Sequence, residues 1–165
     1  MDDLRVRALT PRDSGSIGDV LADDSGHLLR IEGRPAGASD VESLFTGRPP
    51  SLGSARKLTY GLFRGDRLVA VADVLDGWPN PDIAYIGLLQ VRGSLHGQGL
   101  GRAFHDELLG LLPDKRRWRL SVLDANARAL GFWKKLGYRE TGERKPRTGR
   151  TGTEHTAILL ELSRP

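Results

Sequence analysis

The residues whose spacing most clearly suggests chemistry are Gly97, Gly99 and Gly101, which alternate in the stretch "VRGSLHGQGLGRAF" (Val91–Phe104). Glycines let a backbone approach a ligand closely, because no Cβ atom intervenes. An apolar helical pattern follows at once, and a helix N-terminus presents unpaired N–H groups and a positive partial charge. With Arg102 adding a cation, the stretch predicts a turn that binds phosphate.

Two other phosphate motifs fit this stretch less well. A P-loop needs Gly-Lys-Ser/Thr, and the chain has Gly101-Arg102-Ala103. The dinucleotide fingerprint G-x-G-x-x-G has one point in its favour, because Asp124 ends the next strand roughly where a ribose-binding acid is expected. It fails, however, because its third glycine would have to stand at Arg102 or Phe104. A tight strand-to-helix turn without a ligand stays open as an alternative.

The first third of the chain gives weak structural signals. "LRVRAL" (4–9) alternates apolar and basic residues and predicts a strand, after which Thr10 and Pro11 suggest a helix start. "SDVESLF" (39–45) predicts one or two helical turns capped by Ser39, and "TGRPPSLGS" (46–54) predicts a loop.

From Lys57 onward the periodicity is clear. Two strand-like runs flank the turn pair Gly65-Asp66, which predicts a β-hairpin, and Ile83–Val91 predicts a third strand. The later elements follow as helix, strand, helix and two strands: "GLGRAFHDELLGLL", "RWRLSVL", "NARALGFWKKLG", "YRETGER" and "HTAILLEL", with a glycine- and arginine-rich turn between the last two.

The glycine stretch resembles the acyl-CoA pyrophosphate loop of the GNAT superfamily, the GCN5-related N-acetyltransferases. The family motif is Gln/Arg-x-x-Gly-x-Gly/Ala after a strand that ends in valine. Here Val91 closes the strand, His96 takes the Gln/Arg position, and Gly99 and Gly101 are the small residues. His96 departs from the usual pattern, because it lacks a permanent positive charge.

A second stretch, "VLDANARALGFWKKLGYRETG", is similar to the family signature Asn-x-x-Ala-x-x-hydrophobic-Tyr-x-x-x-Gly-Phe/Tyr. The matching residues are Asn126, Ala129, Phe132, Gly137 and Tyr138, and Trp133 stands where many members have tyrosine. Two motifs with the right elements between them are more specific than either one, and the resemblance covers roughly residues 57 to 162.

The resemblance implies an α/β (α+β) fold of GNAT type, a central bent mixed and mostly antiparallel sheet of about seven strands flanked by about four helices. Strands 85–91 and 117–123 are expected to splay apart and admit acetyl-CoA. The expected cofactor-binding residues are Leu89, Gln90, Val91, His96, Gly97, Gln98, Gly99, Leu100, Gly101, Arg102, Asn126 and Trp133.

The resemblance also implies direct acetyl transfer to an amine, with a backbone N–H near Leu89 polarising the thioester carbonyl. The general base is expected among Tyr85 and Asp73, with a water relay as an alternative and with three weaker candidates, Asp76, Glu42 and His155. Tyr85 is a poor base at neutral pH, since a phenol has a pKa near 10. Trp133 offers an indole N–H that donates a hydrogen bond but does not transfer a proton.

The composition limits the remaining classes of protein and the kinds of site that the chain can contain. The chain has 165 residues, which fits a single domain over 1–165, and no cysteine, which excludes disulfides and thiolate chemistry. Four histidines without metal-ligand spacing predict no metal site, and His27 and His105 are expected to be ordinary packing or surface residues. No apolar run of roughly 20 residues and no signal-peptide pattern is present, so we expect a cytoplasmic protein without a membrane partner.

The partner predicted from these observations is a small-molecule amine. A peptide or protein amine is an alternative acceptor, and an acyl-CoA-binding module with little or no transfer activity is an alternative function. The net charge of +4 comes without a nucleic-acid motif or interleaved aromatic residues, so we predict no nucleic-acid partner. A homodimer is considered because dimers are common in the resembled family.

Overall fold

The computed structural model describes residues 3–148, 152 and 154–165. Its centre is a seven-stranded sheet in the order β1-β2-β3-β4-β5-β7-β6, in which β4 and β5 are parallel and all other neighbours are antiparallel. The strands are β1 (Leu4–Ala8), β2 (Arg56–Arg64), β3 (Arg67–Asp76), β4 (Ile83–Val91), β5 (Arg117–Leu123), β6 (Arg139–Thr148) and β7 (Glu154–Ser163). The predicted mixed, mostly antiparallel sheet is confirmed.

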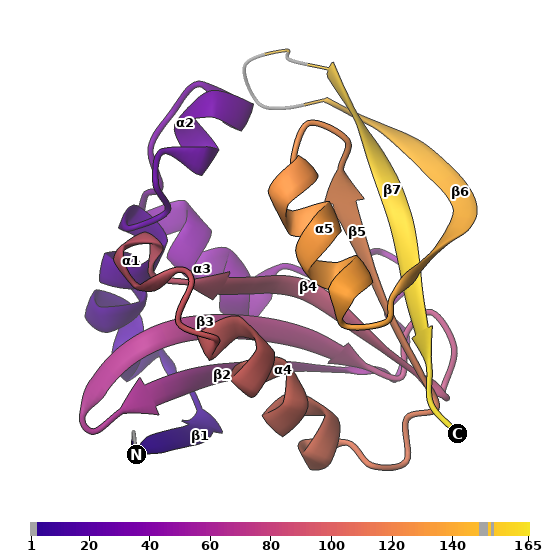
Figure 1. Cartoon of the computed structure of the whole chain (residues 1–165), viewed down its shortest axis with the longest axis horizontal. Coiled ribbons are helices and arrows are strands. Elements are labelled where there is room, and N and C mark those ends of the chain that lie inside the picture. Colours follow the sequence, from indigo (N-terminus) through magenta and orange to yellow (C-terminus); the bar gives the residue numbers. More distant parts are fainter. Residues whose placement is uncertain (1–2, 149–151, 153) are drawn as a thin grey trace.

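Helices cover both faces of this sheet (Figure 1). They are α1 (Ser14–Ala22), α2 (His27–Glu32), α3 (Ala38–Thr46), α4 (Leu100–Leu111) and α5 (Ala127–Lys135), with short 3₁₀ turns at Pro11–Asp13 and Gly93–Leu95. One apolar cluster joins the sheet to α4 and α5, and a second joins the opposite face to α1 and α3. None of the described helices is long and apolar enough to span a membrane.

The β2–β3 hairpin shows how the sequence pattern builds both faces. Side chains alternate across a strand, so Ala70, Ala72 and Val74 of β3 join the first cluster while Val71 joins the second. Gly65 has a φ of 59° at the predicted turn, a conformation that glycine adopts without a steric penalty. The predicted hairpin is confirmed.

The N-terminal third differs from the prediction in two places. Helix α3 begins at Ala38 and not after a Ser39 cap, because the Asp40 carboxylate accepts the N–H of Gly37 at 2.8 Å and satisfies the helix start. Helix α2 was not predicted, since its six residues between the left-handed glycines Gly26 and Gly33 are too few to show a helical period. The turn predicted after Arg144 is shorter than expected, because β6 continues to Thr148 and β7 begins at Glu154; residues 149–151 and 153 of that prediction lie outside the described residues.

Strands β4 and β5 pair only over their first halves. Ile83–Ile86 aligns with Arg117–Leu120, after which β4 continues to Val91 and β5 to Leu123 in diverging directions (Figure 1). In the described part of the chain, no other strand pairs with this edge of β4 beyond Ile86. The expected splay is confirmed, and it leaves backbone N–H and C=O groups available to a ligand.

A buried ion pair lies where β3 ends and where β4 and β5 begin, on the side away from the splay. Lys115 Nζ lies 2.8 Å from Asp76 Oδ1 and donates to the Pro81 carbonyl at 2.8 Å, and Arg56 also pairs with Asp76. Burial alone would raise the pKa of Asp76, but hydrogen bonds from Lys115 and Arg56 lower it below its ordinary value. Asp76 therefore contributes stability above the unfolded-state pKa, and that stability is lost as the pH falls through the lowered folded-state pKa.

We expect Asp76→Ala to lower the free energy of unfolding by about 3–5 kcal/mol, because it leaves Lys115 buried without its counter-charge. Asp114→Ala is the matched control, since Asp114 lies 3.6 Å from the same ammonium but its side chain is 74% exposed. We expect it to cost less than about 1 kcal/mol. Urea denaturation followed by tryptophan fluorescence measures both, and equal losses would contradict this assignment.

Candidate active site

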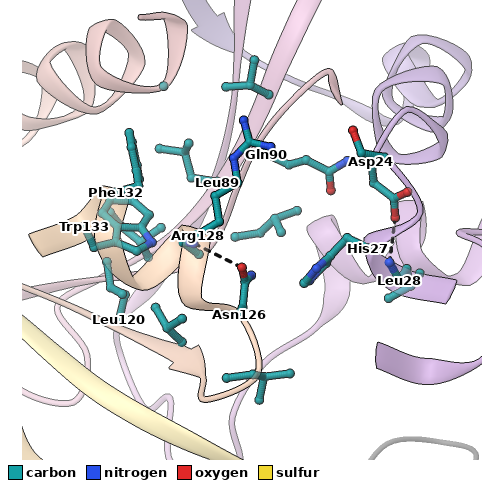
Figure 2. A pocket seen from close by; sticks show the side chains of 18 of the residues that line it. Asp24, His27, Leu28, Leu89, Gln90, Leu120, Asn126, Arg128, Phe132 and Trp133 are labelled. Atoms are coloured by element: carbon teal, nitrogen blue, oxygen red, sulfur yellow. Dashed lines mark hydrogen bonds between the residues drawn. The ribbon is translucent and has the colours of Figure 1, made fainter. Parts of the chain in front are cut away.

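A cleft of about 840 Å³ passes through the gap between β4 and β5. It runs from the start of α4 to α2 and α3, and Figure 2 shows Phe132 and Trp133 on one side of it and Asp24, His27 and Leu28 on the other. The predicted site residues that line it are Asp73, Leu89, Gln90, Val91, His96, Gly97, Gly99, Leu100, Gly101, Arg102, Asn126 and Trp133. Tyr85 and Gln98 are not among its lining residues.

The glycine turn forms one end of the cleft. Gly97 and Gly99 have φ values of 82° and 77°, and Gly99 is the N-cap of α4, so both need the left-handed region that favours glycine. Arg102, Arg128 and Lys135 also line the cleft, from α4 and α5. Among the described lining residues, the loop and these two helices contribute no carboxylate. Amides at a helix N-terminus with nearby cations suit an anion such as a pyrophosphate.

Side chains from distant elements hold this turn in place. Ser94 Oγ donates to Asp23 Oδ2 at 2.6 Å, which joins the turn to the residue after α1. The hydrogen bond from the Ser94 side chain lowers the pKa of Asp23. The Gln98 side chain accepts a hydrogen bond from Arg64 at 3.2 Å, so it is directed toward β2 and away from the cleft.

His96 lines the cleft, but its ring is turned back onto β4. Nε2 lies 3.0 Å from the Val91 carbonyl oxygen, which fixes Nε2 as the protonated nitrogen of this hydrogen bond. The ring therefore holds the turn against the end of β4, which is a role that its motif position alone did not predict.

The second motif forms the wall next to this turn. The Asn126 side chain accepts the N–H of Ala129 at 3.1 Å and caps α5, a role that is compatible with lining the cleft (Figure 2). Trp133 is 7% exposed and packs edge-on against Phe132 at a centroid distance of 4.9 Å. Trp133 thus serves both as a core residue and as part of the cleft wall.

A β-bulge lies on β4 at the middle of the cleft. Asp73 pairs with Leu88 and Val74 pairs with Ile86, so Gly87 is an extra residue. A Cβ atom at position 87 would overlap Asp73 Oδ1, so only glycine fits beside this carboxylate. Asp73 is 8% exposed, and its Oδ2 lies 3.6 Å from the Nζ atom of buried Lys57.

The pKa of Asp73 differs from that of an ordinary aspartate. Burial raises the pKa of Asp73 above its ordinary value, and the charge of Lys57 and a hydrogen bond from the Gly87 backbone partly oppose that rise. A carboxylate with a raised pKa is a better proton acceptor than an ordinary aspartate. Of the two main base candidates, Asp73 is the one that lines the cleft.

The other candidate bases are placed differently. The Tyr85 hydroxyl pairs with Ser121 Oγ, and its ring packs edge-on against Trp78 at 4.9 Å, behind the lining residue Ser121. Asp76 belongs to the buried ion pair at the other strand ends, and Glu42 is exposed on α3 outside the lining. His155 lines the cleft and bonds through Nε2 to the Ile31 carbonyl at 3.2 Å.

Two histidines that the sequence offered no reason to single out have defined positions. His27 lines the cleft across from Asn126 (Figure 2), and burial lowers its pKa below the ordinary histidine value. The sequence around His27 has no motif or periodic pattern that would predict its position in the cleft. His105 is 2% exposed and bonds through Nε2 to the Tyr138 hydroxyl at 2.8 Å, which is the expected packing role. Within the described chain, no group of three or more His, Cys, Asp or Glu side chains is placed to hold a metal ion.

Known proteins with this architecture include several acetyltransferases. An acetyltransferase from Thermus thermophilus has 23% identity and a TM-score of 0.78, with 99% of each chain covered. The Salmonella typhimurium acetyl transferase that modifies the N-terminal serine of ribosomal protein L7/L12 has 16% identity and a TM-score of 0.79, with 98% of this chain and 95% of that chain covered.

An aminoglycoside acetyltransferase, AAC(6')-Ib, solved in complex with coenzyme A, has 19% identity and a TM-score of 0.69, with 98% of this chain and 95% of that chain covered. No curated protein sequence is significantly similar to this chain. The model of the acetyltransferase (GNAT) family matches residues 27–138, which include the glycine turn, the bulged strand and the second motif. On this match and on the fold, the chain belongs to the GNAT acetyltransferase family.

Proposed function

We propose that this protein is an N-acetyltransferase that transfers an acetyl group from acetyl-CoA to the primary amine of a small molecule. The observation that carries the proposal is the single cleft that has the glycine turn and its cations at one end and the buried carboxylate of Asp73 beside the β4 bulge. These groups fit an anionic thioester donor and an amine acceptor that meet between them.

Different residues of the cleft would bind different parts of acetyl-CoA. The amides from Gly97 to Arg102 would bind the pyrophosphate, and the open edge of β4 from Leu89 to Val91 would pair with the pantetheine arm. Bound there, acetyl-CoA supplies an activated acetyl group as a thioester. The backbone N–H near Leu89 would donate to the carbonyl oxygen as negative charge develops on it.

Asp73 would remove the proton of the amine. As the amine nitrogen forms its bond to the carbonyl carbon, Asp73 accepts one proton, and the carbon–sulfur bond breaks to release the thiolate of CoA. Trp133 lies where a tyrosine would protonate that thiolate in many relatives, and an indole does not transfer protons. We therefore assign protonation of the thiolate to water.

The shape of the cleft favours a small acceptor over a folded protein. His155 of β7 bonds to the Ile31 carbonyl of α2 at 3.2 Å, so two elements on opposite sides of the cleft are joined. We infer that this link between two walls of the cleft hinders the entry of a bulky protein surface. A small amine passes such a constriction more easily.

Thiol release tests the proposal directly. Because the chain contains no cysteine, a thiol reagent detects only the CoA that is produced. We expect CoA release from acetyl-CoA to accelerate when a primary amine is added, with one acetylated amine formed for each thiol. Tight binding of acetyl-CoA without any amine-dependent release across a broad amine panel would instead support a binding module.

A further inference from the structure

The part of the cleft farthest from the glycine turn has apolar walls. They are formed by Leu21 of α1, Leu28 and Ile31 of α2, Leu44 of α3 and Leu88 of β4. Leu21 and Leu44 are only 5% and 3% exposed, and with Leu88 they belong to the core cluster on this face of the sheet. A ligand that enters here therefore contacts the apolar core of the protein.

Most charged side chains around these walls already have partners. The Asp24 carboxylate accepts two backbone N–H groups at the start of α2, at 2.9 and 3.0 Å. Asp40 and Glu32 both pair with Arg34, at 2.8 and 2.9 Å, and Arg30 donates to a backbone carbonyl at 2.8 Å. These groups shape the walls, and a ligand with several charges would have to compete for them.

Asp73 and Lys57 form a neutral ion pair at the floor of this region. Asp73 is paired with Lys57 through Oδ2, and its other oxygen, Oδ1, faces Gly87 at the bulge. We place the one amine nitrogen of the acceptor at Asp73, which lines the cleft, and the neutral pair itself adds no net charge that would attract a polycation. A second ammonium or a row of hydroxyls would meet either Leu side chains or carboxylates that already have partners, and an unpaired polar group there is costly.

We propose that the acceptor is an apolar primary monoamine, an alkylamine or arylalkylamine, whose nitrogen binds at Asp73 and whose body packs against Leu21, Leu28, Leu44 and Leu88. This inference rests on the proposed function, which leaves the amine unspecified. If the inference is correct, the apolar walls of the acceptor region make polyamines, aminoglycosides and peptide termini poor acceptors for this protein.

The test is a chain-length series from propylamine to hexylamine, with phenethylamine as the aromatic member and spermidine and kanamycin as polycations. Each added methylene that is buried against the walls should lower KM about threefold to fourfold. We expect hexylamine and phenethylamine to have the highest kcat/KM. A KM that does not change with chain length, or a preference for spermidine or kanamycin, would overturn the inference.

Two neighbouring leucines of α2 provide matched variants. Leu28 lines the cleft, whereas Leu29 does not and is 56% exposed. Leu28→Asp should raise KM for hexylamine at least about tenfold, because it brings an unpaired carboxylate to the wall. Leu29→Asp should leave KM unchanged, and both variants should bind acetyl-CoA like the unaltered protein. Equal KM values for the two variants would contradict the assigned wall.

Amine binding can also be measured without turnover. Calorimetric titration of the amines into the protein saturated with CoA should show the same dependence on chain length. If acetyl-CoA does not bind, the proposed function fails. If acetyl-CoA binds and the amine affinity is independent of chain length, only the inference about the acceptor fails.

Discussion

Gly101→Asp is expected to weaken acetyl-CoA binding at least about 100-fold, the largest effect on the donor site. Gly101 lies in the first turn of α4 and lines the cleft, next to the proposed position of the pyrophosphate. A carboxylate there opposes the charge of the phosphates, and juxtaposed like charges cost several kcal/mol. Isothermal titration calorimetry gives the dissociation constants of the variant and of the unaltered protein.

Two controls separate charge from shape in this experiment. A Cβ atom at position 101 would lie 3.1 Å from the Phe132 ring, so Gly101→Ala measures the steric part alone and should lose much less affinity. Gly110→Asp makes the same chemical change near the other end of α4, where a Cβ atom would meet no neighbour within 4 Å, and should bind acetyl-CoA normally. Normal binding by Gly101→Asp would show that the glycines form only a turn.

Asp73→Asn is expected to reduce kcat about 100- to 1,000-fold, because the amide cannot accept the proton of the amine. The acetyl-CoA dissociation constant should stay unchanged, since Asp73 lies near the middle of the cleft and the glycine turn forms one end of it. Asp66→Asn, in the exposed turn between β2 and β3, makes the same change away from the site and should keep full activity. Full activity of Asp73→Asn would leave proton removal to water.

The pH profile gives this prediction a second readout. Burial raises the pKa of Asp73, and the base must be ionised, so kcat/KM should fall as the pH drops through a pKa above that of an ordinary aspartate. The same acid limb should be absent from the Asp73→Asn profile. If the limb persists in the variant, it belongs to another group that faces the cleft, and His27 is then the first to test.

Local chemistry made much of this protein predictable. The glycine turn, the apolar face of the helix after it and the Asn126 motif depend on residues close together in the chain, and backbone geometry relates their spacing directly to structure. The β2–β3 hairpin was predictable for the same reason, because Gly65 has to adopt a positive φ at its turn. These elements gave rise to the family resemblance and form the half of the cleft that we propose for the acetyl donor.

Tertiary structure decided the half of the cleft that we propose for the acceptor. Asp73 and Lys57 lie on neighbouring strands, and their pairing beside Gly87 depends on a one-residue bulge that no local pattern predicts. Likewise, α2 has too few residues and too little periodicity to be predicted, yet it brings His27 and Leu28 to the cleft. The sequence alone determined the glycine turn and the order of the elements from β2 onward. Strand register and long-range packing determined which carboxylate is buried and which side chains line the proposed acceptor region.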